Sequence, residues 1–527
     1  MRTSKGLRFA ILLCLPALAL ITFIVMGGID NKKSPVIFLR NRAVSKAQTK
    51  EVKTPPKKSQ KTTTVDMRMS RVTTAANMSV SVFNRSHVYQ VADTLLLKIV
   101  ARDANGRPKS YGQDFMVAKV YTESPIKACT GGRITDYGNG TYIARFLLSW
   151  PGNLAVSVKL IHSSEAVQVL RSARDLFSDR RITYCRFLDK KSNISEWTRC
   201  TFDPNSKMNP TKICDFSQRK QNVTWVCQKP KDIHCDFMVA CKNNREVGVE
   251  LLKKMITDED ALLFNSSRVN QEIPNDLRIT VERSHNPDPL KGRHLPPCGP
   301  RLPETTSEGY WYNNSWNSLR CHSHQSLSSL SIYKCLQNKT FLILGDSTAR
   351  QYYTYLKQFD DSIKIDFIFH NFPRTHDSNY IKSLSYAADM IDRVVGGPNV
   401  VVILSIWAHY TALPLETFRS RVYGIRHAIE RLHKKYPDTK VIWRTGNLRE
   451  HKILVHFLHN SNWFAYQLVL EAKRILSGLN IFIMDVWEMS ICTNYLVHPE
   501  PNVIKNHIDL IFSYICPGFI KDLSRLK

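Results

Sequence analysis

The 527-residue sequence has far fewer acidic than basic residues, and it is not hydrophobic enough for a membrane protein with several spans. Asp and Glu number 45 against 74 Lys and Arg, so the formal net charge is +29. A mean hydropathy of −0.27 excludes a polytopic membrane protein, so this chain is not itself a transporter. Hydrophobic residues still make up 43% of the chain, which excludes a wholly disordered or fibrous protein. The length predicts about three domains of roughly 100–200 residues each.

One apolar segment stands near the N-terminus, at residues 9–29, and basic residues precede it. About 20 apolar residues suffice to cross a bilayer as a helix, whereas a cleaved signal usually has a shorter apolar core. Because residues 25–28 (VMGG) form a poor cleavage site, we predict that residues 1–29 are an uncleaved signal-anchor. This single segment implies a type II membrane protein of the Golgi or cell surface. Cleavage after the glycine pair would instead produce a secreted protein.

Cysteines and glycosylation sequons also predict a luminal or extracellular chain. Apart from Cys14 in the apolar segment there are 12 cysteines, an even number that is typical of disulfides in an oxidising compartment. No Cys-x2-Cys pair has a matching second pair, so residues 321–324 (CHSH) are interpreted as a disulfide cysteine with two surface histidines, and no metal is expected. Eight N-x-S/T sequons predict a glycosylated surface, at Asn77, Asn84, Asn139, Asn193, Asn222, Asn265, Asn313 and Asn338.

Residues 30–74 are predicted to form a basic, disordered stem. Between residues 32 and 71 there are twelve Lys and Arg but two acidic residues, with few apolar residues and no periodicity. Such a stem is mostly solvated, and attraction to acidic glycans is an unspecific alternative. Because no nucleic-acid-binding module is visible, no nucleic-acid partner is expected.

The middle of the chain predicts two modules and a connector. Residues 75–180 alternate apolar and polar residues over short runs separated by glycine-rich turns, which predicts an antiparallel β-sandwich. Residues 181–245 hold six cysteines between short apolar runs, so disulfides must offset a small core in this Cys-rich module. Residues 246–300 are interpreted as a connector that becomes rich in proline.

After residue 335 the pattern changes to buried-type strands that alternate with amphipathic helices. This alternation predicts a parallel sheet with helices on both faces, within a domain that spans residues 301–527. Active sites in such sheets lie at the carboxyl ends of the strands. The expected strands are 340–344, 363–369, 399–406, 440–445 and 481–487, and the expected helices include 348–358, 415–436 and 503–516.

A candidate nucleophile stands at the end of the first of these strands, in Gly345-Asp346-Ser347. Gly345 permits a tight turn, so Ser347 can project above the sheet. The N-terminus of the following helix offers free N–H groups to a developing oxyanion. The alternative is that Ser347 simply caps this helix.

A candidate base follows 151 residues later, at His498, between the last strand and the last helix. Serine first and histidine last is the order of the SGNH, or GDSL, hydrolases. His427, His433 and His507 lie on helices and are less favoured. Together Ser347 and His498 predict nucleophilic catalysis on an acyl group.

Several segments carry a family resemblance. Residues 136–142 (DYGNGTY) resemble filamin-type immunoglobulin-like modules, and the sandwich followed by the Cys-rich module resembles the neurexophilins. With residues 344–351 (LGDSTARQ) and 503–510 (VIKNHIDL), the chain resembles the neurexophilin and PC-esterase domain-containing proteins. The resemblance implies an SGNH-like α/β domain and a Ser–His–Asp acetyltransferase or esterase acting on glycoprotein glycans, with sialic acid as the candidate sugar and acetyl-CoA as the donor if the enzyme is a transferase.

The sequence departs from the family's Asp-x-x-His motif, because Tyr495 stands where the aspartate belongs. Asp485, or Glu488 beside it, is the candidate replacement acid. Bulky Trp407 follows the central strand, where it could fill the site or stack on a sugar. By position, the candidate oxyanion or substrate contacts are Gly345, Asp346, Asn371, His409 and Asn447.

Two functions therefore compete. The first is a luminal glycan O-acetyltransferase or acetylesterase. The second is a neurexophilin-like ligand, secreted or membrane-anchored, that binds a cell-surface receptor and whose esterase domain is a degenerate scaffold.

Overall fold

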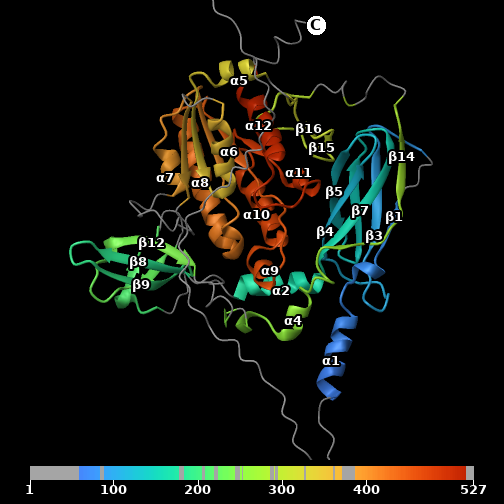
Figure 1. The fold of residues 1–527 in the computed structure, drawn as a ribbon, viewed down its shortest axis with the longest axis horizontal. Coiled ribbons are helices and arrows are strands. Elements are labelled where there is room, and N and C mark those ends of the chain that lie inside the picture. Colours follow the sequence, from blue (N-terminus) through green and yellow to red (C-terminus); the bar gives the residue numbers. More distant parts are fainter. Residues whose placement is uncertain are drawn as a thin grey trace, which may run out of the picture. The chain divides into compact units, whose positions relative to one another are not determined.

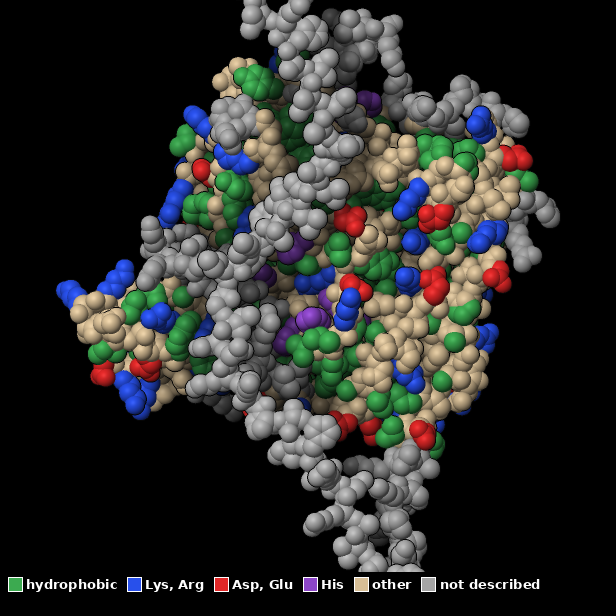
Figure 2. All heavy atoms as spheres, in the orientation of Figure 1, with side chains coloured by type: hydrophobic (Ala, Val, Ile, Leu, Met, Phe, Trp, Pro, Cys, Tyr) green, Lys and Arg blue, Asp and Glu red, His purple; other side chains and the backbone are tan. Residues whose placement is uncertain are grey.

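The computed structural model describes most of the chain after residue 58 (Figure 1). No helix in this described part is both long and apolar enough to cross a bilayer, and the predicted anchor, residues 1–29, lies outside it. On the face seen in Figure 2, Lys and Arg side chains are scattered among acidic and polar ones, as is typical of a solvated surface. The described residues are 59–83, 88–176, 183–203, 208–218, 224–243, 250–251, 253–284, 290, 295–325, 328–359, 363–370 and 386–517.

The end of the predicted stem differs from the expected disordered chain. Helix α1 spans Ser59–Ser70, and Met69 near its end is buried in an apolar cluster with residues of later helices. Arg68 also pairs with Glu259 and Asp260, at 3.2 and 2.6 Å. These contacts give this segment folded partners, which a basic composition does not reveal.

The N-terminal half is β-rich. Its strands are mostly antiparallel, in the order β1-β3-β6-β5-β4-β7-β14-β2. β5 pairs with β4 through its first half and with β6 through its second, so it belongs to both sides of one apolar core. The strands are β1 (Ser79–Val82), β2 (Tyr89–Gln90), β3 (Thr94–Val100), β4 (Phe115–Thr122), β5 (Ala128–Asp136), β6 (Thr141–Leu147) and β7 (Gly152–His162), followed by helix α2 (Ser164–Leu176).

Later segments extend this sheet. The predicted connector contributes helix α4 (Asp258–Leu262) and strands β13 (Gln271–Glu272) and β14 (Arg278–Glu282), both of which pair with β7. The hairpin of β15 (Gly309–Tyr312) and β16 (Ser315–Ser318) pairs with β5. Segments that the sequence assigns to the connector and the C-terminal domain therefore build part of the β-rich half.

The Cys-rich module forms a second antiparallel sheet, in the order β10-β11-β9-β8-β12. Disulfides join Cys185 to Cys241, Cys200 to Cys227 and Cys214 to Cys235 within it. The remaining pairs are Cys129–Cys492, Cys298–Cys321 and Cys335–Cys516, so the expected use of cysteine in disulfides is confirmed. Its strands are β8 (Thr183–Asp189), β9 (Ile194–Thr201), β10 (Ile213–Asp215), β11 (Val226–Gln228) and β12 (Met238–Asn243).

The C-terminal half contains the predicted parallel sheet, in the order β18-β17-β19-β20-β21. All four of its strand pairings are parallel, which confirms the expectation from the strand–helix alternation. The strands are β17 (Thr340–Gly345), β18 (Lys364–Phe369), β19 (Val400–Ser405), β20 (Lys440–Arg444) and β21 (Phe482–Met484).

Helices cover both faces of this sheet. α6 and α12 share a core with Phe341, Ile343 and Ile403 on one face, whereas α8 and α10 pack with Leu344 and Leu404 on the other. The helices are α5 (Ser329–Leu336), α6 (Ser347–Lys357), α7 (Ala387–Asp392), α8 (Leu415–Lys435), α9 (Leu454–Asn460), α10 (Asn462–Leu476), α11 (Trp487–Ile491) and α12 (Pro501–Ile515).

Candidate active site

Ser347 lies where β17 meets α6, at the carboxyl edge of the parallel sheet. A Cβ at Gly345 would collide with the backbone of Ser405, so a glycine is needed for β17 to pass this close to β19. The side chain of Asp346 caps α6 by accepting a hydrogen bond from the backbone N–H of Thr348 at 2.8 Å. The alternative interpretation of Ser347 as the helix cap is therefore wrong.

The hydroxyl of Ser347 contacts the predicted base. His498 Nε2 lies 2.7 Å from Ser347 Oγ. Partial burial of the ring, with Arg350 and Arg444 nearby, lowers the pKa of His498 below its usual 6.5. A neutral imidazole at this distance can accept the serine proton. The structure thus brings the two residues of the predicted Ser–His pair together.

Two amides hold the loop that carries His498, residues 492–500. Gln351, one turn after Ser347, donates to the backbone carbonyl of Pro499 at 3.0 Å. Asn447 Nδ2 donates to the backbone carbonyls of Leu496 and Leu448, both at 2.9 Å. Since these bonds use its N–H groups, Asn447 positions the histidine loop, and its predicted role in binding an oxyanion is not supported.

Arg444, at the end of β20, is a buried cation beneath this loop. Its Nη2 donates to Asn447 Oδ1, and its Nε donates to the hydroxyl of Tyr352 on α6 at 3.2 Å. Its side chain is 1% exposed, and within the described chain no carboxylate contacts it. Arg444 therefore links the serine helix to the histidine loop. Arg444 is not among the site residues predicted from the sequence, although a charged residue at the end of a buried strand is a usable signal.

The carboxylate of Asp346 is fully buried beside the Ser–His pair. It accepts hydrogen bonds from the Thr348 hydroxyl at 2.7 Å and from the backbone N–H of Ala408 at 2.9 Å. Burial by itself would raise the pKa of Asp346, but two neighbouring histidines and these bonds outweigh it and lower the pKa. Asp346 is thus ionised, and its charge opposes the lowering of the pKa of His498. Its hydrogen bonds join the start of α6 to the segment after β19.

The two histidines beside Asp346 are His370 and His409. His409, predicted as a substrate contact, has its Nδ1 3.0 Å from His370 Nε2, and the rings lie 5.0 Å apart. Asn371, the other predicted contact from this region, lies outside the described residues.

The predicted acid Asp485 is occupied elsewhere. Its carboxylate is 2.7 Å from Lys473 Nζ and accepts from the Thr445 hydroxyl at 3.0 Å. Burial would raise the pKa of Asp485, but the charge of Lys473 outweighs it and the pKa is lowered. Glu488 in turn binds Arg133. No carboxylate of the described chain contacts His498, so the structure does not support either residue as its acid partner.

Tyr495 stands where the family's Asp-x-x-His motif has its aspartate, and it contacts the β-rich half. Its backbone is in the left-handed region, with φ +53°, and its ring turns toward the β-rich half, where Lys159 Nζ lies 5.7 Å from the ring centre. Burial, together with Glu272, raises the pKa of Tyr495 to about 12. The position that holds an acid in the family motif therefore serves a packing contact.

Trp407 fills space beneath the site and is not open to a sugar. Its ring is 2% exposed, its Nε1 donates to the Thr348 hydroxyl at 3.3 Å, and the guanidinium groups of Arg444 and Arg449 lie 5.8 and 5.3 Å from it. Of the two roles that the sequence suggests for Trp407, the structure favours filling.

A groove of about 390 Å³ opens beside Ser347 and His498. The backbone N–H of Ser347 donates to no group of the described chain, so it is available to an oxyanion at this point. The other lining residues come from α6, the residue that follows it and α12, and are Arg350, Gln351, Thr354, Tyr355, Gln358, Pro501 and Ile504.

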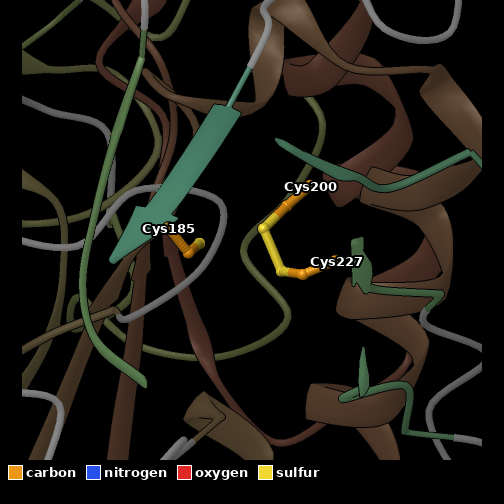
Figure 3. A group of neighbouring side chains, drawn as sticks. All are labelled: Cys185, Cys200 and Cys227. Atoms are coloured by element: carbon orange, nitrogen blue, oxygen red, sulfur yellow. A yellow bond between two sulfur atoms is a disulfide. The ribbon is translucent and has the colours of Figure 1, made fainter. Parts of the chain in front are cut away.

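One group of sulfur atoms lies at distances compatible with a metal. Cys185, Cys200 and Cys227 lie within 4.8 Å of one another (Figure 3). All three are in disulfides, so none is a thiolate that could bind a metal in this structure. Cys321 is also in a disulfide, beside His322 and His324.

The predicted glycosylation sites are mostly at the surface. Asn77 is half-buried, and its side-chain amide donates to the Asp103 carbonyl at 2.9 Å. Asn84 and Asn222 lie outside the described residues. The exposed ones are Asn139, Asn193, Asn265, Asn313 and Asn338.

Together, the fold and site define a multidomain protein with a β-rich, disulfide-bonded N-terminal half and a C-terminal parallel-sheet domain that carries a Ser–His pair. Residues 54–262 match the family model for neurexophilin. Residues 316–362 and 357–516 match the model for the C-terminal domain of NXPE family member 4-like proteins. The chain therefore combines a neurexophilin region with a PC-esterase-like C-terminal domain, which confirms the family expected from its motifs. The neurexophilin match and the disulfides also fit a protein of the secretory pathway.

Proposed function

We propose that this chain is a luminal enzyme that transfers acetyl groups to, or removes them from, hydroxyls of glycoprotein glycans, with sialic acid as the candidate sugar. The observation that carries the proposal is the 2.7 Å contact between His498 Nε2 and Ser347 Oγ at the carboxyl edge of the sheet. The PC-esterase-like family match agrees with this chemistry. As part of this proposal, the C-terminal parallel-sheet domain is of the SGNH type, and the β-rich half contains an immunoglobulin-like module.

In the first step, Ser347 Oγ attacks the acetyl carbonyl carbon and His498 Nε2 takes the serine proton. The oxyanion forms beside the free N–H of Ser347 and the N-terminus of α6. When it collapses, the bond to the donor breaks, and His498 returns the proton to the leaving group. With acetyl-CoA as the donor, the leaving group is the thiol of coenzyme A.

In the second step, a sugar hydroxyl attacks the acetyl-enzyme, His498 takes its proton, and Ser347 leaves with that proton restored. Water in place of the sugar hydroxyl completes an esterase reaction. The mixed lining of the groove, with Arg350, Gln351 and Gln358, suits a polar or acidic acceptor.

The catalytic histidine works here without a carboxylate partner from the described chain. A triad acid orients the imidazole and stabilises its charged form, and its loss costs up to about 10⁴ in rate. The buried charge of Asp346 supplies part of that electrostatic support. We therefore expect a slow but serine-dependent enzyme.

The competing function is that of a ligand with a degenerate site. The observations that favour it are that no described carboxylate contacts His498 and that the Trp407 ring lies beneath the site. As a ligand the protein would bind a cell-surface receptor whether or not Ser347 is present. Its setting in either case would be the Golgi or the cell surface, through the predicted anchor at residues 1–29, or the medium after cleavage.

The test uses the full chain, produced in a secretory system so that disulfides and glycans form. The protein is incubated with acetyl-CoA and sialylated mucin glycans, and mass spectrometry measures added acetyl groups. Ser347→Ala should abolish the transfer, whereas Ser110→Ala, at an exposed serine of the β-rich half, should not change it. Transfer that is equal in both variants would refute the enzyme proposal and leave the ligand function.

A further inference from the structure

The loop that carries His498 is fixed at its start to the β-rich half. It begins at Cys492, directly after α11, and Cys492 forms a disulfide with Cys129 on β5. The two cysteines are 363 residues apart in sequence. The bond therefore ties the start of the catalytic loop to the neurexophilin-matching region, six residues before His498.

The helix before this loop sits tightly on the same strand. A Cβ on Gly131 of β5 would come within 2.9 Å of the Ile491 side chain, so α11 packs directly against the strand backbone. Arg133 on β5 pairs with Glu488 of α11 at 2.5 Å. On the neighbouring strand β15, the Trp311 indole donates to the Met489 carbonyl at 3.0 Å. α11 thus contacts two neighbouring strands of the same sheet, β5 and β15.

The middle of the loop makes a second contact with the β-rich half. Tyr495 holds a left-handed backbone, which is unfavourable for a bulky residue and persists only where the surroundings enforce it. Its partly buried ring faces Lys159 on β7, with the Lys159 Nζ 5.7 Å from the ring centre. The same turn is closed by the carbonyl of Tyr495, which accepts from the backbone N–H of Glu450.

We propose that the β-rich half positions the catalytic histidine, through the Cys129–Cys492 disulfide at the start of its loop and the contact of Tyr495 with Lys159 in the middle. This inference rests on the proposed Ser–His chemistry. It assigns the neurexophilin-matching half a place in the active-site architecture, in addition to any binding role. It also gives Tyr495 a function at the position where the family motif carries an acid.

Small displacements at the histidine have a large effect. A misplacement of about 1 Å of a catalytic group costs about 10²-fold in rate. Removing the disulfide with Cys129→Ser and Cys492→Ser together should therefore slow covalent labelling of Ser347 by a fluorophosphonate by about tenfold to 10²-fold. Because substrate binding residues in the groove are untouched, kcat should fall while KM changes little.

The test measures two things on the full chain: fluorophosphonate labelling of Ser347 and hydrogen exchange of residues 493–500. The cysteine pair variant is compared with Cys185→Ser and Cys241→Ser, which removes a disulfide between β8 and β12. In case the cysteine variant does not fold, Tyr495→Ala and Tyr495→Phe form a second pair, because phenylalanine keeps a ring against Lys159.

We expect faster exchange of the loop and slower labelling in the Cys129/Cys492 and Tyr495→Ala variants, with wild-type behaviour in Tyr495→Phe and the control pair. Loop exchange that stays unchanged in both test variants would overturn the inference. Wild-type protein that is not labelled at Ser347 would overturn the proposed function instead, and loop exchange would still decide the positioning.

Discussion

Replacing Asp346 by asparagine tests whether a buried carboxylate organises the site. The two side chains have the same shape, but asparagine has one acceptor oxygen and an NH2 group where aspartate has two acceptors. Asp346 Oδ1 accepts from Thr348 at 2.8 and 2.7 Å, and Oδ2 accepts from the backbone N–H of Ala408 at 2.9 Å and that of Trp407 at 3.4 Å. If the amide oxygen keeps the Thr348 bonds, the NH2 group must face two backbone donors.

The magnitude follows from these contacts. Hydrogen bonds to a charged group contribute about 1.5–3 kcal/mol, and a buried donor left without an acceptor costs about 1–3 kcal/mol. The hydrogen bond from Ala408 is short and the one from Trp407 is long. We therefore count the loss of one full hydrogen bond and part of a second. Asp346→Asn should therefore lower the free energy of unfolding of the C-terminal domain by about 2–4 kcal/mol.

The assay is denaturant unfolding followed by tryptophan fluorescence, with Asp366→Asn as the matched control. Asp366 is exposed on β18, and such a surface change should stay within about 0.5 kcal/mol. The variant has a second expected effect, because the charge of Asp346 raises the pKa of His498. Labelling of Ser347 should persist to lower pH in the variant, although its maximum falls. Equal stability of Asp346→Asn and Asp366→Asn would refute the structural role given to this carboxylate.

Three other predictions concern titration and packing. The rate of Ser347 labelling should rise through an apparent pKa below 6.5 and stay level to pH 8, because burial lowers the pKa of His498; a midpoint above 6.5 would contradict this. Burial raises the pKa of Asp114 from 3.8 to about 6, so the folded state holds this proton after the unfolded state has released it, and its contribution to stability should decline between about pH 4 and 6. Asp114→Asn should make the free energy of unfolding depend less on pH in this range. The same pH dependence in the variant and the wild type would contradict the raised pKa of Asp114. Arg444→Met should slow Ser347 labelling by freeing Asn447, whereas Arg474→Met at the surface should leave the labelling rate unchanged.

The parallel sheet and the Ser–His pair could be predicted from the sequence because both leave local signals. β17 and β19 are runs of consecutive apolar residues, as expected of strands buried on both faces. Gly345 marks a close approach of backbones, Ser347 begins α6, and His498 stands in the loop just before α12. The order of strands and helices then places both residues at one edge of the sheet.

The contacts that surround this pair could not be predicted, because they join distant segments. The pairing of Cys129 with Cys492 and of β15 with β5 has no local pattern in either partner. The same is true of Asp485, which stands after the last strand as an acid partner would, yet meets Lys473 from α10. Sequence position alone does not show which way a buried side chain turns.

The most direct measurement is the detection of an acetyl group on Ser347. The full chain is mixed with acetyl-CoA, quenched in acid after a short time and digested, and the peptide that contains Ser347 is examined by mass spectrometry alongside that of the His498→Ala variant. We predict an acetylated Ser347 peptide in the wild type, at a level that falls by about 10²-fold or more without the histidine. An unmodified Ser347 in folded protein, or equal acetylation in both proteins, would contradict the claim that Ser347 and His498 form a working catalytic pair.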